Sequence, residues 1–227
     1  MIGQAGETEF DLRFRFFGIP VRVHPFFWLM AAFVVWRSTP DPRLKFLGVI
    51  CVFVSILVHE MGHALTLRRY GYPSEIVLYA MGGYATSTHL STWRNVLMSA
   101  AGPAAGFLLY GLIRLLISFL IGYSPDVLQN DATMYCLSLL LWINLWWGVL
   151  NLVPCLPLDG GRIMEALVLR YVRRRSRERV LQISILASGA VAVWALQHLP
   201  STQFMLFLFG FLCANSVIAY NQQQGRM

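Results

Sequence analysis

The sequence is poor in charged side chains. Only 13% of its 227 residues are Asp, Glu, Lys or Arg, whereas 57% are hydrophobic. Soluble globular domains carry about 25% charged residues, so this composition excludes an ordinary soluble enzyme or binding domain. Acidic residues are especially scarce, 11 against 18 basic ones. The composition is that of a polytopic membrane protein, in which charge collects at the ends of the spans.

Cysteine pairs and a cleavable leader are also missing. The four cysteines are scattered among apolar segments, which excludes a disulfide framework and a cysteine-based zinc cluster and indicates small buried side chains. Residues 1–23 lack the apolar centre of a signal peptide, so we expect the first span to be an uncleaved anchor. We expect three regions: a cytoplasmic segment with a short β element at 1–23, one membrane domain at 24–221, and a short cytoplasmic tail at 222–227.

Long apolar runs are abundant. The segments long enough, or nearly long enough, to cross a bilayer lie at 24–37, 44–67, 95–121, 133–153, 180–197 and 203–220. The fourth continues, with a break, to residue 172. Between them, Glu75 to Thr88 alternates around Met81-Gly82-Gly83, a pattern that predicts a hairpin. The predicted fold is therefore all-α and polytopic, with about six transmembrane helices and a small membrane-associated β element.

The distribution of basic residues predicts the orientation. An even number of spans places thirteen of them on one side: Arg13, Arg15, Arg22, Arg68, Arg69, Arg94, Arg170, Arg173, Arg174, Arg175, Arg177, Arg179 and Arg226. Only Arg37, Arg43 and Lys45 fall on the other side. The positive-inside rule then predicts cytoplasmic N- and C-termini. Because this topology accounts for the net charge of +7, we expect contact with the lipid bilayer and no nucleic-acid partner.

The second apolar run contains His59-Glu60-Met61-Gly62-His63. On a helix the two histidines are four residues apart and share a face, so both imidazoles can bind one zinc ion. Glu60 lies about 100° further round, at the rim of that site, where it could take a proton from water. A carboxylate at bilayer depth costs roughly 2.5–3.5 kcal/mol, and a divalent cation would offset that cost. The alternative is a hydrogen-bonded histidine pair without metal.

Asp159 is the best candidate for a third ligand. A catalytic zinc site usually has three protein ligands and one open position. Asp159 follows Pro154 and Pro157, which interrupt the fourth apolar segment, and precedes Gly160-Gly161. Irregular backbone at membrane depth is tolerated where it is buried in protein or lines a wet cavity. The alternative is a surface loop in which Asp159 caps the following helix.

Together these motifs resemble the site-2 protease family of intramembrane zinc metalloproteases. The match consists of His-Glu-x-x-His in an early span and, about 90 residues later, Asn-x-x-Pro-x-x-Pro-x-Asp-Gly beginning at Asn151. The resemblance implies that His59, His63 and Asp159 bind zinc, that Glu60 is the catalytic acid and base, and that Asn151 positions substrate. Gly102-Pro-Ala-Ala-Gly106 is similar to the family's third-helix motif, although Gly106 stands where Asn is common.

The resemblance implies an intramembrane zinc endopeptidase with one zinc ion per chain. Its partner would be a membrane-anchored protein cut within or near a transmembrane segment, and regulation would need a separate protein or a prior cleavage. One rival is a membrane metal-handling protein, a transporter or non-catalytic sensor, that uses the same ligands. A second is the other class of membrane protease with His-Glu-x-x-His, which would want a glutamate as third ligand; Glu165 is available but lacks the motif context.

Overall fold

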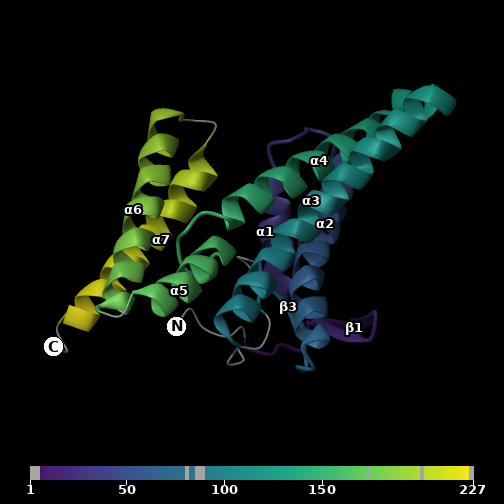
Figure 1. Cartoon of the computed structure of the whole chain (residues 1–227). Coiled ribbons are helices and arrows are strands. Elements are labelled where there is room, and N and C mark those ends of the chain that lie inside the picture. Colours follow the sequence, from purple (N-terminus) through teal and green to yellow (C-terminus); the bar gives the residue numbers. More distant parts are fainter. Residues whose placement is uncertain (1–5, 80–81, 85–89, 173, 200–201, 225–227) are drawn as a thin grey trace. The chain divides into compact units, whose positions relative to one another are not determined.

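The computed structural model describes residues 6–79, 82–84, 90–172, 174–199 and 202–224. In these ranges the chain forms seven α-helices and four short strands (Figure 1). The helices are α1 (Pro25–Val35), α2 (Pro42–Arg69), α3 (Thr92–Tyr123), α4 (Asp131–Asn151), α5 (Asp159–Tyr171), α6 (Ser176–Gln197) and α7 (Gln203–Gln224). The strands are β1 (Leu12–Phe16), β2 (Ile19–Val23), β3 (Ile76–Tyr79) and β4 (Gly82–Tyr84).

Five helices are long and apolar enough to cross a membrane: α2, α3, α4, α6 and α7. They coincide with five of the six expected spans. The sixth, the expected segment at 24–37, forms the 11-residue helix α1, which at 1.5 Å per residue is about 16 Å long, against a hydrocarbon thickness of about 30 Å. The broken continuation expected after the fourth span is α5. The prediction of a mostly helical polytopic fold is confirmed.

The chain divides into two compact units. The first contains residues 1–88 and 101–148, and the second contains residues 89–100 and 149–227. In the first unit, the four strands form one sheet in the order β1-β2-β3-β4, in which β2 and β3 are parallel and the other neighbours are antiparallel. The β3–β4 pair confirms the hairpin expected between Glu75 and Thr88; residues 80–81 and 85–89 lie outside the described residues.

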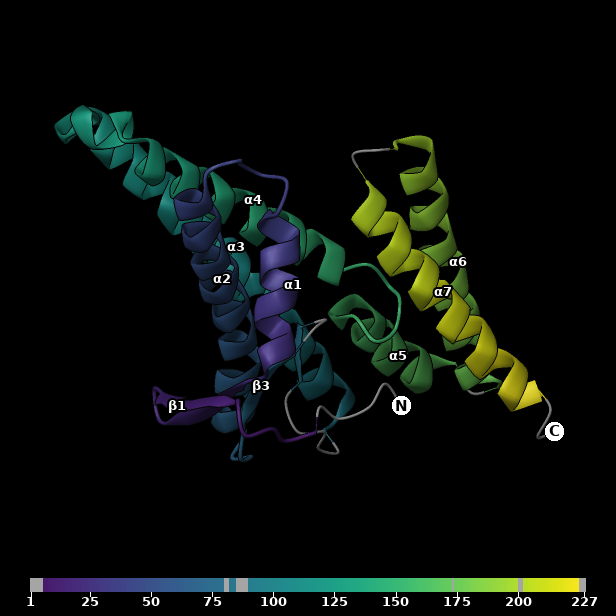
Figure 2. The same ribbon diagram turned by 180° about the vertical axis from the view of Figure 1, so that it is seen from behind.

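The sheet lies at the end of the first unit where α1 begins and α2 ends. In Figures 1 and 2, β1 projects sideways from the lower end of α2, across the helix direction. The turn between β1 and β2 uses Phe17 and Gly18, both at positive φ, as the type I′ turn of a two-residue hairpin requires. Arg68 Nη1, at the end of α2, donates to Phe17 O at 2.8 Å. This bond ties the hairpin to the helix that carries the histidines.

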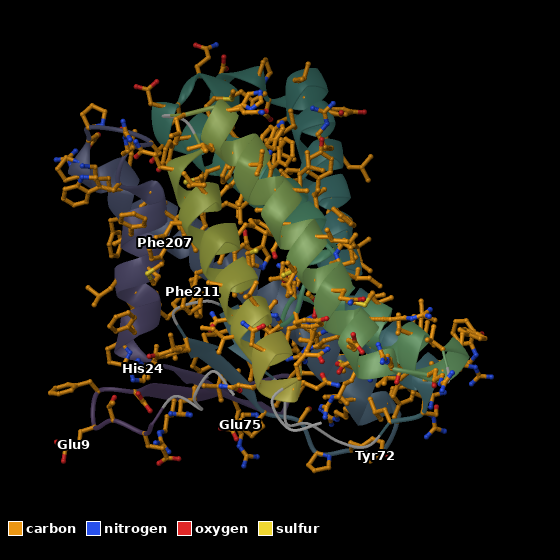
Figure 3. All side chains as sticks on the ribbon, turned by 90° about the vertical axis from the view of Figure 1, so that its left-hand side faces the viewer. Glu9, His24, Tyr72, Glu75, Phe207 and Phe211 are labelled. Atoms are coloured by element: carbon orange, nitrogen blue, oxygen red, sulfur yellow. The ribbon has the colours of Figure 1, made fainter. Side chains whose placement is uncertain are left out.

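One core joins the sheet to the first helices. Its buried members come from β2, β3, α1, α2 and α4, and include Val23, Leu78, Phe27 and Ile56. Alternation along β2 and β3 places Val23 and Leu78 on the helix side of the sheet. His24, labelled at the lower end of α1 in Figure 3, caps α1: its Nδ1 accepts from Phe26 N at 3.1 Å. His24 is therefore the N-cap residue of α1.

Helix α2 has well-defined ends. At its start, Asp41 accepts a hydrogen bond from Arg43 N at 2.8 Å, and Pro42 occupies the first helical position. At its end, Gly71 adopts φ +82°, while Gly71 N donates to Arg68 O and Tyr72 N donates to Leu67 O. This is a Schellman motif, which satisfies the last carbonyl groups of the helix. The 28-residue helix spans about 42 Å, so both ends can lie outside the hydrocarbon core.

The second unit is built on a helical hairpin. Helices α6 and α7 lie side by side in both Figures 1 and 2. A small core gathers Cys155, Leu208, Phe209 and Leu212. The loop between α4 and α5 is tied to α6 because Leu156 N donates to Ser184 Oγ at 3.2 Å. The irregular segment that precedes Asp159 therefore packs within protein, as expected for backbone of this kind at membrane depth.

Candidate metal centre

Three potential ligands converge on one face of α2. His59, Glu60 and His63 are buried, with 3%, 6% and 6% of their surfaces exposed. One ligand atom from each lies within 4.8 Å of the other two. They meet because residues four apart in a helix share a face and residue 60 adjoins that face. Among the described residues, this is the cluster of His, Cys, Asp or Glu that could hold a metal ion.

The spacing of the two imidazoles fits a shared ion. Their Nε2 atoms are 3.2 Å apart, and the rings are inclined at 78°. Two nitrogens bound to one tetrahedral zinc at about 2.05 Å would be separated by about 3.3 Å. The same distance would allow one Nε2–H to donate to the other Nε2. The buried carboxylate of Glu60 beside them favours the metal, because a cation compensates a charge that a neutral histidine pair does not.

Helix α3 covers the histidines with a glycine. A Cβ atom placed on Gly102 would lie 2.8 Å from His59 Nε2 and still closer to His63 Nε2. Only a residue without a side chain leaves room beside both ring nitrogens. One face of α2 also meets α3 at backbone distance, because a Cβ atom on Gly62 would collide with the carbonyl group of Ala101. Small residues therefore let α2 and α3 pack closely in this part of α3.

Asn151 and Asp159 belong to the second unit. Asn151 is the last residue of α4 and Asp159 is the first residue of α5; each is 8% exposed. The structure therefore brings His59, Glu60 and His63 together, whereas the roles expected for Asn151 and Asp159 toward the metal remain predictions. Glu165, the alternative third ligand, lies on α5 and is only partly buried.

Two glycines let the chain fold back before Asp159. A Cβ atom on Gly160 would collide with the backbone carbonyls of Leu152 and Val153, and one on Gly161 would collide with Cys155. The first turn of α5 thus packs directly against the loop that leads to it. The tight backbone packing at Gly160-Gly161 explains how Asp159 becomes buried at a helix start.

One polar contact near the site was not predicted from the sequence. Asn144 of α4 donates from Nδ2 to Ser55 Oγ of α2 at 2.9 Å, and both side chains are 2% exposed. The sequence does indicate such a contact, because an asparagine inside an apolar span usually forms a hydrogen bond to a neighbouring helix. Ser55 also lies four residues before His59, on the same helical face.

Comparison with known proteins identifies the family. The profile of peptidase family M50 matches residues 47–132 and 123–195, which include His59, Glu60, His63 and Asp159. A zinc metalloprotease of Methanocaldococcus jannaschii is 31% identical over 157 residues, which cover 68% of this chain and 44% of that protein. Stage IV sporulation protein FB of Bacillus subtilis is 25% identical over 206 residues, or 90% of this chain and 67% of that protein.

The fold has a solved counterpart. The site-2 protease from Methanocaldococcus jannaschii superposes with a TM-score of 0.59 at 24% identity, covering 93% of this chain and 95% of that one. The chain belongs to peptidase family M50, and the resemblance to site-2 proteases is confirmed. With its five apolar helices, it is an integral membrane protein. It spans 44% and 57% of the length of the first two curated relatives.

Proposed function

We propose that this protein is an intramembrane zinc endopeptidase. It would hydrolyse peptide bonds within or near the transmembrane segments of membrane-anchored substrates. The observation that carries the proposal is the buried cluster of His59, Glu60 and His63 on an apolar helix, with the two Nε2 atoms 3.2 Å apart. Membership of peptidase family M50 and relatives named as zinc metalloproteases support the same activity.

His59, His63 and Asp159 would hold one zinc ion per chain. Two imidazoles and one carboxylate form a familiar donor set that leaves a fourth position open. The support for Asp159 is its burial at the start of α5 and the pair of glycines that makes this burial feasible. Asn151, buried at the end of α4, would position the substrate near this break in the helix.

Glu60 would carry the protons. When bound, zinc would supply a Lewis acid that activates water and stabilises negative charge on the carbonyl oxygen of the scissile bond. The Glu60 carboxylate would accept the proton of the attacking water and pass it to the amine that leaves. Glu60 lies beside the two histidines but not in line with them along the helix, and this position suits an acid and base better than a metal ligand.

The substrate must expose its backbone to be cut. A transmembrane helix satisfies its own peptide groups, so a scissile bond becomes accessible only where the helix unwinds. Strand β4 is a terminal strand of the sheet in the described part of the chain, and such an edge can pair with an extended peptide. We propose this edge as the surface that receives the unwound substrate strand.

The basic residues support cytoplasmic termini. In the first unit, α1 begins and α2 ends beside the sheet, so Arg22 and Arg68 lie at one end of both helices. His59 lies about 13 Å before Arg68 at 1.5 Å per residue. The zinc would then lie in the cytoplasmic half of the bilayer, and one cleavage product would be released toward the cytoplasm.

The Glu60→Gln variant tests the function. Glutamine keeps the size of the side chain but cannot accept a proton, so the rate should fall about 10²–10⁴-fold or more while zinc content stays near one ion per chain. The measurements are metal analysis of the purified protein and cleavage of a transmembrane peptide. A metal-handling protein would bind zinc equally well in both forms and would not cleave the peptide in either. Cleavage by the variant at the wild-type rate would place the active site elsewhere.

A further inference from the structure

A buried hydrogen bond joins α4 to α2 one turn before the metal site. Asn144 Nδ2 donates to Ser55 Oγ at 2.9 Å and to Leu140 O, in its own helix, at 2.8 Å. Asn144 and Ser55 are each 2% exposed. Burying an amide at bilayer depth is costly unless its groups are paired. Both amide hydrogens are used here, one within α4 and one across to α2.

The acceptor lies in the row of residues that includes the histidines. Ser55, His59 and His63 are successive residues four apart on α2, so they follow one another along a single face. A bond that fixes Ser55 against α4 therefore fixes the rotation of α2 about its own axis. An imidazole nitrogen lies roughly 6 Å from the helix axis, so a rotation of about 10° would move it by about 1 Å.

Helix α3 passes beside the amide. A Cβ atom on Gly106 would lie 3.5 Å from Asn144 O and 3.7 Å from its Oδ1, so the bare backbone of α3 passes directly beside Asn144. One turn earlier on α3, Gly102 faces the Nε2 atoms of His59 and His63. Gly102 and Gly106 thus lie on one face of α3, which contacts the two histidines at one turn and Asn144 at the next turn.

We infer that Asn144 is a positioning residue for the metal site and acts through Ser55. The inference rests on the proposed zinc site, and it adds a residue that makes no contact with the metal. The bond holds the histidine face of α2 in the rotation at which both Nε2 atoms can bind one ion beside Gly102. A displacement of about 1 Å at a catalytic centre can cost about 10²-fold in rate, so losing the bond should lower kcat by about 10- to 100-fold.

Two substitutions remove the bond from opposite sides. Asn144→Leu removes the donor and keeps the side-chain size, and Ser55→Ala removes the acceptor and favours the helix. Ser55→Thr keeps a hydroxyl group and should retain most of the activity. Matched controls remove polar groups that bond within their own helix: Asn215→Leu, whose Nδ2 donates to Phe211 O, and Ser118→Ala, whose Oγ donates to Arg114 O.

The readouts are the visible spectrum of the cobalt-substituted protein, its zinc affinity, and kcat and KM for a transmembrane peptide. We expect Asn144→Leu and Ser55→Ala to alter the cobalt spectrum, to weaken zinc binding about tenfold, and to lower kcat with little change in KM. The double variant should be no worse than the poorer single variant, because the two residues share one interaction. If Asn144→Leu does not fold, Ser55→Ala and Ser55→Thr still provide the comparison.

Two failures are distinguishable. A wild-type protein that neither binds cobalt nor cleaves the peptide overturns the proposed function, and the positioning role with it. A wild-type protein that does both, beside Ser55→Ala and Asn144→Leu variants with unchanged spectra, zinc affinity and kcat, overturns the positioning role alone. An equal loss of zinc affinity and kcat in the Asn215→Leu control would also overturn the positioning role, because the loss would then follow from removing any polar group from a span.

Discussion

Replacing Gly102 with alanine should disable the metal site while leaving α3 intact. The added Cβ atom would lie 2.8 Å from His59 Nε2 and closer still to His63 Nε2. Carbon and nitrogen atoms without a bond between them are normally about 3.5 Å apart. The methyl group would therefore occupy the space next to both proposed zinc-binding nitrogens, and either the rings or helix α3 must move.

The cost can be bounded from the structure. Overpacking a well-packed interior by one methyl group costs about 1–3 kcal/mol, and each 1.4 kcal/mol corresponds to a tenfold change in an equilibrium constant. If the rings move, this cost reduces the free energy of zinc binding, and the zinc affinity of Gly102→Ala should fall by about 10- to 100-fold. Helix propensity acts in the opposite direction, since alanine stabilises a helix interior by about 1 kcal/mol relative to glycine.

Two other glycines of α3 provide matched controls. A Cβ atom on Gly106 would make an ordinary contact at 3.5 Å, and one on Gly111 would have no neighbour within 4 Å. Gly106→Ala and Gly111→Ala should therefore bind zinc like the wild type and unfold at the same or a slightly higher temperature. Zinc affinity measured by chelator competition, with thermal unfolding in detergent, separates the three variants. Wild-type zinc affinity in Gly102→Ala would refute the expectation that the His59 and His63 rings, and not α3, give way to the added methyl group.

Three further predictions concern the third ligand, the orientation and the β1–β2 hairpin. Asp159→Ala should lower zinc content strongly while Glu165→Ala should not; full retention of zinc in the first variant would rule out Asp159 as a ligand. With the native cysteines replaced, a single cysteine at Asp126 should react with an impermeant reagent added outside intact cells and one at Arg177 should not; the reverse pattern would invert the topology. The pKa of Asp11 is held well below its ordinary value by a hydrogen bond from the Thr8 hydroxyl and by another from Arg22. The Asp11 carboxylate therefore stabilises the hairpin above about pH 4, and this stabilisation is lost as the pH falls further. Hydrogen exchange of the β1–β2 amides should show this acid-dependent loss of protection, and an Asp11→Asn variant that kept the same pH dependence would contradict the assignment.

The sequence alone determined most of the helices and which residues could form a metal site. Apolar runs located the membrane-spanning helices because a bilayer imposes a minimum length on any span. His59, Glu60 and His63 could be grouped because they belong to one helix, in which the spacing of residues along the chain fixes their positions in space. The break before Asp159 was equally readable, since proline and glycine act on the backbone locally.

Other features depend on which helices meet, and only the tertiary structure decided them. In the sequence, Gly102 was only the first residue of a motif of small residues; its close approach to His59 and His63 depends on the packing of α3 against α2. Asn144 and Ser55 are 89 residues apart in the chain, and their hydrogen bond exists because α4 packs on α2. The physical reason is that helix-to-helix packing is set by the complementarity of two surfaces, whereas periodicity along one chain describes only one of them.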